Sequence, residues 1–165
     1  LTDEKSEFAA INQHGRLVVF TEASTIEWEG NEKYGGSAHH FLLPRDDTDG
    51  SYRDRIYLQP RVLSYDFDNK DKKELVVINN QELGGGSFGQ FKRFTKGNIE
   101  VLSWNDIALA PMFQTRTVQG WISDVAISDF DNDGKMEIIA AVVDRNKFSL
   151  MSKRKKSNII SYELE

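Results

Sequence analysis

Short apolar runs separated by polar turns dominate the chain and predict strands. The run ELVVIN (74–79) is continuous, as in a strand buried on both faces. RVLSY (61–65) and MFQTRTV (112–118) alternate between apolar and polar residues, as in a strand with one buried face. IEVLSWN (99–105) predicts a fourth strand, and KGN (96–98) before it a hairpin turn. We therefore expect an all-β protein with antiparallel strands.

This pattern repeats along the chain. The motif D-F-D-N-x-x-K-x-E begins at Asp66 and again at Asp129, 63 positions later, and an apolar run follows it each time. Strands are predicted around the second copy at WISDVAIS, MEIIAAVV and, after a basic turn, IISYELE. Near the start, GRLVVFTEASTIEWEG (15–30) resembles the back half of the unit. A repeat of this kind indicates an architecture built from successive similar units.

Four antiparallel strands repeated in series are the building plan of a β-propeller, in which each four-stranded sheet is a blade. We expect a single propeller segment over 1–165, about two and a half blades of a larger ring. Residues 1–45 would end one blade, 46–118 would form a complete blade, and 119–165 a last blade without its fourth strand. The chain does not begin with Met, so we expect a piece of a longer protein with an open sheet edge, its partners including the remaining blades.

Composition and charge exclude several classes of function. The chain contains no cysteine, which excludes disulfides, thiol catalysis and cysteine zinc sites. Its net charge is −5 with no basic half, so a nucleic acid is not an expected partner. No apolar run is long enough to span a bilayer, so membrane insertion is not expected.

The second copy of the motif has the spacing of a calcium loop. Carboxylates fall at loop positions one, three, five and nine, and a glycine at position six permits a sharp turn. Calcium is bound by six to eight oxygen ligands, which alternate residues of a tight loop can supply. An EF-hand requires Glu at position twelve between helices, but Ala140 is there and the flanks are predicted strands. The predicted ligands are Asp129, Asp131, Asp133, the backbone carbonyl of Lys135, and Glu137.

The sequence DFDNDGKMEIIAAVV resembles the FG-GAP/VCBS repeat, the calcium-loop blade of integrin-α-type propellers and many bacterial exported proteins. That family's pattern is D-x-[DN]-x-[DN]-G-x-x-[DE], and the loop at 129–137 matches every position. The resemblance implies a propeller with Ca²⁺ at the turn between the first two strands of a blade. It also implies a periplasmic, cell-surface or secreted protein with a binding or adhesive role.

The first copy departs from this pattern. Asp66, Asp68 and Glu74 keep the acidic positions, but Lys70 occupies position five and Asp71 replaces the glycine. These carboxylates are therefore weaker metal candidates. Two interpretations remain: the loop binds calcium, or the ammonium group of Lys70 serves as the counter-charge.

Other polar clusters favour structural roles. The segment RDDTDGSYRD (45–54) is interpreted as a polar hairpin loop, GGGSFG (84–89) as a flexible loop, and KRKK (153–156) as a solvated turn. His39 and His40 should face opposite sides of a strand and so not share a metal ion. The three tryptophans are expected to pack between neighbouring blades: Trp28, Trp104 and Trp121.

Nothing in the sequence indicates a catalytic nucleophile. We expect a non-catalytic calcium-binding segment that interacts with a protein or a glycan, or has a structural role. The alternative is part of a propeller enzyme, a polysaccharide lyase or hydrolase, whose active site lies in blades outside this segment.

Overall fold

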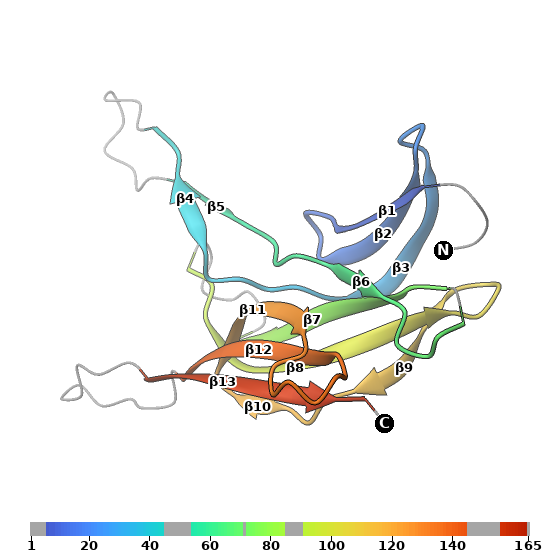
Figure 1. Cartoon of the computed structure of the whole chain (residues 1–165). Coiled ribbons are helices and arrows are strands. Elements are labelled where there is room, and N and C mark those ends of the chain that lie inside the picture. The colour runs from blue at the N-terminus through green and yellow to red at the C-terminus, as the bar shows by residue number, and fades with distance from the viewer. Residues whose placement is uncertain (1–5, 45–53, 71, 85–90, 145–155, 165) are drawn as a thin grey trace.

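The computed structural model describes residues 6–44, 54–70, 72–84, 91–144 and 156–164 (Figure 1). Over these ranges the chain forms thirteen strands and no helix, and every pair of neighbouring strands is antiparallel. The all-β prediction is confirmed. Within the described residues no sheet closes on itself, and no helix has the length and hydropathy needed to cross a membrane.

The N-terminal sheet contains β1 (Glu7–Ile11), β2 (Arg16–Thr21) and β3 (Ile26–Lys33), in that order. β2 and β3 lie where the sequence predicted strands, whereas β1 was not predicted. β4 (His40–Leu42) and β5 (Arg55–Tyr57) follow as a separate two-stranded hairpin, which projects from the body of the molecule in Figure 1.

The middle sheet contains five strands, and it is the most extensive of the structure. Its members are β6 (Leu63–Tyr65), β7 (Glu74–Glu82), β8 (Phe94–Trp104), β9 (Leu109–Gln114) and β10 (Val118–Gln119). β6, β7, β8 and β9 are paired in this order. β10 also pairs with β8, at Lys96 and Gly97, whereas β9 pairs with the later part of β8. The predicted strand at 112–118 is thus divided. At the division, Thr115 donates its backbone N–H to Ile99 O and accepts from Ile99 N through its hydroxyl, both at 2.9 Å.

The predicted turn at 96–98 was wrong, because these residues lie inside β8 and pair with β7. Gly97 is required there by a close approach. A Cβ atom on it would lie 2.4 Å from Asn80 Oδ1 and 3.2 Å from Ile122. A glycine in the interior of a strand often marks such a place.

The C-terminal sheet contains β11 (Trp121–Ser128), β12 (Glu137–Asp144) and β13 (Lys156–Glu163), paired in that order. β11 and β12 lie where the sequence predicted them, and β13 covers most of the predicted last strand but begins earlier, at Lys156 of the predicted basic turn. In the described part of the chain, β13 pairs with β12 alone and forms the edge of this sheet.

β7 contributes to two hydrophobic clusters, one on each face of the middle sheet. Val76 and Ile78 pack toward the C-terminal sheet, and Leu75 and Val77 pack toward the N-terminal sheet. All four are at most 2% exposed, so the prediction of a strand buried on both faces is confirmed. The first cluster also contains Ile99, Val101, Ile122, Val125, Ile138, Ala140 and Val142. The second also contains Ile11, Leu17, Val19, Tyr34, Leu102 and Leu109.

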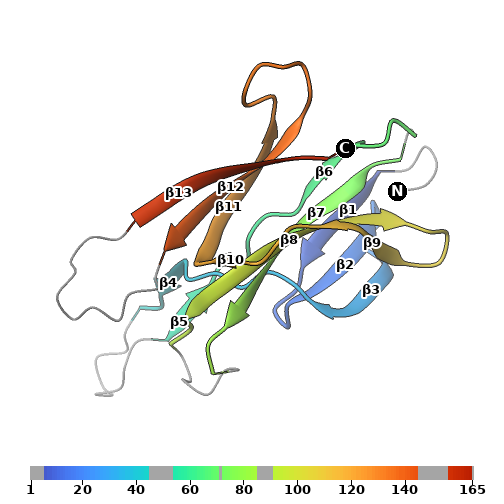
Figure 2. The ribbon, with the colours of Figure 1, turned by 90° about the horizontal axis from the view of Figure 1, so that it is seen from below.

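One buried amide joins the middle sheet to both neighbours. Asn80 at the end of β7 donates through Nδ2 to Gly36 O at 2.7 Å and to Ile122 O at 2.8 Å. Its Oδ1 accepts from Ile122 N at 3.0 Å. Gly36 follows β3 and Ile122 lies in β11, so a single side chain connects segments from three parts of the sequence. Figure 2 shows β7 and β8 running between the two outer sheets.

Candidate metal centre

Two acidic loops join the first two strands of the middle and C-terminal sheets. The first loop links β6 to β7, and the second links β11 to β12. In the first, carboxylate oxygens of Asp66, Asp68 and Glu74 all lie within 4.8 Å of one another. In the second, an equivalent triad brings carboxylate oxygens within the same distance, and its members are Asp129, Asp131 and Glu137. Each triad could hold a metal ion.

The glutamate of each loop is fixed by the same backbone hydrogen bond. Phe67 N donates to Glu74 Oε2 at 2.8 Å, and Phe130 N donates to Glu137 Oε2 at 2.7 Å. Both glutamates begin a central strand and are buried, with exposed fractions of 1% and 7%. The phenylalanine amides were not identified as part of the site from the sequence, although both belong to the repeated D-F-D motif.

The first aspartate of each loop also has the same role. Lys70 N donates to Asp66 Oδ1 at 3.1 Å, and Asp133 N donates to Asp129 Oδ1 at 3.0 Å. In both cases a carboxylate accepts from the amide four residues later and closes the loop. The sequence repeat is therefore also a repeat of hydrogen bonding.

The loops share a left-handed residue at the same position. Asn69 has a φ angle of 55° and Asn132 a φ angle of 62°, a region that asparagine occupies more readily than most residues. In the second loop Gly134 follows with a φ angle of 91° and with nothing within 4 Å of a Cβ position. Gly134 is thus needed for its backbone conformation, as the loop pattern predicted.

The second loop brings together three of its four predicted carboxylate ligands. Asp133 is not in the triad, and its Oδ1 accepts from Lys135 N at 2.9 Å. The Lys135 side chain turns away to form an ion pair with Glu163 on β13. That pairing could not be deduced from the spacing of the loop, because Glu163 comes from a different strand.

The first loop contains an internal cation. Lys70 Nζ lies 2.7 Å from Asp68 Oδ2, and the hydrogen bond and charge of Asp68 raise the pKa of Lys70. The other oxygen, Asp68 Oδ1, is buried and has no hydrogen-bond partner among the described residues. This geometry corresponds to the ion-pair interpretation of the first loop.

Burial opposes the charge of Glu74. Its pKa is raised mainly by desolvation, and the neighbouring charges of Asp68 and Asp66 raise it further, whereas the hydrogen bond from Phe67 N–H lowers it. A cation among these carboxylates would offset both the desolvation and the mutual repulsion. Both triads offer oxygen atoms alone, which suits a hard cation such as calcium rather than zinc.

Another buried carboxylate has a different environment. Glu100 on β8 is 7% exposed and accepts hydrogen bonds from three neutral donors. These are Tyr34 Oη at 3.3 Å, Asn98 Nδ2 at 3.3 Å and Gln114 Nε2 at 3.2 Å. Burial, together with the charge of Glu100, raises the pKa of the Tyr34 hydroxyl above its ordinary value. No pattern in the sequence indicates this cluster, because it joins distant segments.

The histidines and tryptophans lie outside the acidic triads. His39 packs against Trp121 with ring centroids 4.8 Å apart, while His40 packs against Tyr57 at 5.2 Å, and both ring pairs are tilted. Trp28 and Trp104 meet edge to face at 6.3 Å between the N-terminal and middle sheets. Residues 45–53 of the polar segment, the glycine-rich segment after 84 and the basic residues at 153–155 lie outside the described residues.

Comparisons with known proteins give no match: no protein family, no curated protein and no solved structure matches this chain. The class of the protein therefore rests on its fold and loops. It is an all-β protein with two acidic loops of the same geometry.

Proposed function

We propose that this chain is a non-catalytic, calcium-binding β-propeller segment that serves as a structural and interaction module of an exported protein. One observation carries the proposal: the same hydrogen-bonded loop occurs twice, and each time three carboxylates converge. Without a cation such convergence is unfavourable, since like charges repel and Glu137 is buried.

We assign the calcium to the second loop. Asp129, Asp131 and Glu137 would hold it, and the Asp133 side chain and the Lys135 carbonyl would be its further oxygen ligands. The ion would neutralise the triad and fasten the turn between β11 and β12, so its binding energy would add to folding stability. In the first loop, Lys70 supplies the positive charge instead.

The propeller assignment is supported by the order of the strands. In the middle sheet the consecutive strands β6, β7, β8 and β9 pair in sequence order, and the three strands of the C-terminal sheet pair in the same way as the first three of these. The acidic loop occupies the same connection in both sheets. Export is proposed from the family resemblance, and the millimolar calcium outside cells would fill even a weak site. The proposed partner is a protein or a glycan.

The test is calcium titration of the metal-free chain by isothermal calorimetry, followed by thermal unfolding in calcium and in excess EGTA. We expect one calcium per chain and a higher Tm in calcium. At a free concentration one hundred times Kd, the gain would be about 2.7 kcal/mol. A melting curve unchanged by EGTA would contradict the proposal.

A further inference from the structure

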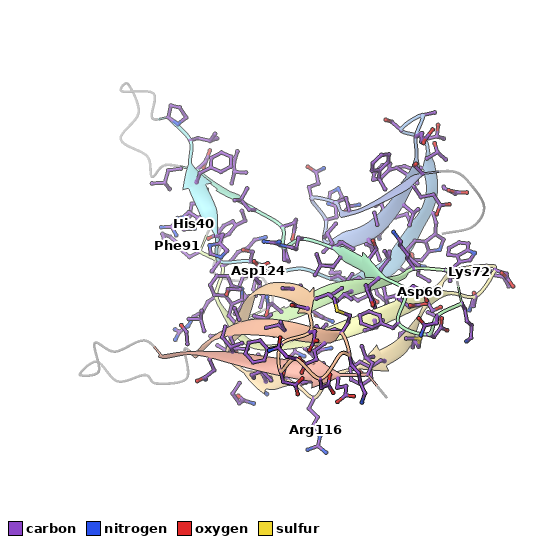
Figure 3. The ribbon with its side chains drawn as sticks, viewed as in Figure 1. His40, Asp66, Lys72, Phe91, Arg116 and Asp124 are labelled. Atoms are coloured by element: carbon purple, nitrogen blue, oxygen red, sulfur yellow. The ribbon has the colours of Figure 1, made fainter. Side chains whose placement is uncertain are left out.

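A second polar site lies at the end of the middle sheet opposite the acidic loops. β7 begins with Glu74 at the first loop, and three residues near its other end, Asn79, Asn80 and Glu82, line a cavity of about 390 Å³. The β1–β2 turn, the segment after β3, the end of β5 and the start of β8 complete the walls. Figure 3 places His40 and Phe91, which lie near this end, far from Asp66.

The floor of the cavity is preformed. Gly36 has a φ angle of 80°, and a Cβ atom on it would lie 2.7 Å from the Phe94 ring and 2.9 Å from Asn80 O. Its carbonyl is held by Asn80 Nδ2 at 2.7 Å. Only glycine fits this position, and the buried amide fixes it without help from a ligand.

A lysine is clamped at the rim by an aromatic ring. Lys92 donates its backbone N–H to Tyr57 Oη at 3.0 Å, and its ammonium group lies 5.1 Å from the centroid of the same ring. Among the described residues Lys92 forms no ion pair. A cation–π contact attracts the ammonium group but leaves its three N–H donors available for hydrogen bonds.

The charge of the cavity differs from that of the chain. Lys33 also lines it and has no ion pair among the described residues, whereas Glu82 is the single carboxylate of the lining. The chain as a whole carries a charge of −5, so two lysines against one glutamate favour an anionic ligand.

The remaining walls favour a hydroxylated ligand over a flat apolar one. Lys92 and His40 both pack against the Tyr57 ring, and Phe94 is only 2% exposed, so neither ring offers a free face. Gln13 and Asn79 also line the cavity, and an amide side chain can bond to hydroxyl groups.

We propose that this cavity binds a small, hydroxyl-rich anion, for which a sugar carboxylate is the simplest case. Lys33 and Lys92 bind the anionic group, and Gln13, Asn79 and Glu82 bind the hydroxyls. The volume falls within the range of small-molecule sites, roughly 300–1,000 Å³. The site shares no residue with the acidic loops, so it stands or falls independently of the calcium site.

The experiment is calorimetric titration of the whole chain with D-glucuronate, D-glucose and D-glucose 6-phosphate, with calcium present throughout. We expect glucuronate to bind and glucose to bind at least about tenfold more weakly, a difference of 1.4 kcal/mol. A tighter response to glucose 6-phosphate would identify the anionic group as a phosphate. Equal affinities for glucuronate and glucose, or no binding of either anion at millimolar concentrations, would overturn the proposal.

Lysine variants locate the binding. Lys92→Met and Lys33→Met should each weaken anion binding about tenfold, since each removes a charge-assisted hydrogen bond. Lys92→Arg should retain most of it. The matched control is Lys96→Met, which removes an exposed lysine of β8 outside the cavity. An equal loss in Lys96→Met would show that the anions respond to overall charge, and the cavity site would be rejected.

Discussion

Single side chains distinguish the two acidic loops. Glu74 and Glu137 occupy equivalent places, yet only the first loop has a lysine at position five. The sequence was sufficient to find both triads, because their spacing is repeated. It could not show that Asp133 bonds to its own loop, since that depends on a rotamer.

Glu137→Gln should give opposite results with and without calcium. The amide keeps an oxygen for Phe130 N–H but removes one ligand charge. In calcium we expect a lower Tm than the wild type, with a loss of up to about 2.7 kcal/mol. In EGTA we expect an equal or higher Tm, because repulsion within the triad is reduced. Glu27→Gln, at an exposed position of β3, is the control. The same shift of Tm for Glu137→Gln in both buffers would contradict this prediction.

The raised pKa of Glu74 predicts a pH dependence of stability. Because the folded state holds the proton more tightly than the unfolded state, the contribution of Glu74 is fully present below its unfolded pKa and is lost as the pH rises through its raised folded pKa. Glu74→Gln imitates the protonated form. In metal-free buffer its stability relative to the wild type should therefore be greatest near neutral pH and decline in acid. Urea unfolding across this range measures the difference, and a constant difference would exclude this role.

Asn80→Leu should destabilise the fold strongly. It leaves the Ile122 N–H and two carbonyls without their side-chain partner, and unsatisfied buried groups cost about 1–3 kcal/mol each. We expect a loss of about 3 kcal/mol or more by urea unfolding. The control is Asn158→Ala on the exposed part of β13. A loss no greater than that of the control would show that the three hydrogen bonds contribute little.

At the scale of elements, the long strands and the short β6 were predicted, whereas β1, β4 and β5 were missed. β4 and β5 contain three residues each, which is too few to show a periodicity. They flank the polar segment 45–54, which was predicted to be a hairpin loop. β1 is a five-residue strand that begins with a half-buried Glu7 and an exposed Phe8, so its pairing with β2 decides its structure. The prediction of a turn at 96–98 was wrong because Gly97 leaves room for the Asn80 side chain and does not reverse the chain.

The first loop should become a calcium site when its sequence is made to match the second. Lys70→Asp with Asp71→Gly removes the internal cation and restores the glycine at position six. We expect the calcium stoichiometry measured by calorimetry to rise by one per chain. In the parallel control, Lys73→Asp with Lys70 retained, we expect no change. An unaltered stoichiometry in the double variant would show that the first loop lacks another requirement for binding.

At the scale of the whole molecule, the two hydrophobic clusters share the middle sheet. This arrangement follows from the alternation of side chains along β7, which the apolar run already indicated. The pairing of the two outer sheets with its two faces was not evident from the sequence, because it depends on contacts between distant segments.

We expect the chain to unfold in one transition. Trp28 and Trp104 report on the N-terminal side of the middle sheet, and Trp121 begins the C-terminal sheet. Variants retaining Trp104 alone or Trp121 alone, with phenylalanine at the other positions, should give coincident urea curves by fluorescence. Separate midpoints would show that the outer sheets unfold independently.

The double use of β7 means that the period of the sequence is not a unit of folding. A fragment that ends before Trp121 would lack the C-terminal sheet and would expose a continuous hydrophobic surface to water, which includes Val76, Ile78, Ile99 and Val101. Such a fragment should precipitate rather than behave as a smaller version of the parent. A shortened version of this chain should therefore keep the C-terminal sheet, or replace it with another element that covers the same face of the middle sheet.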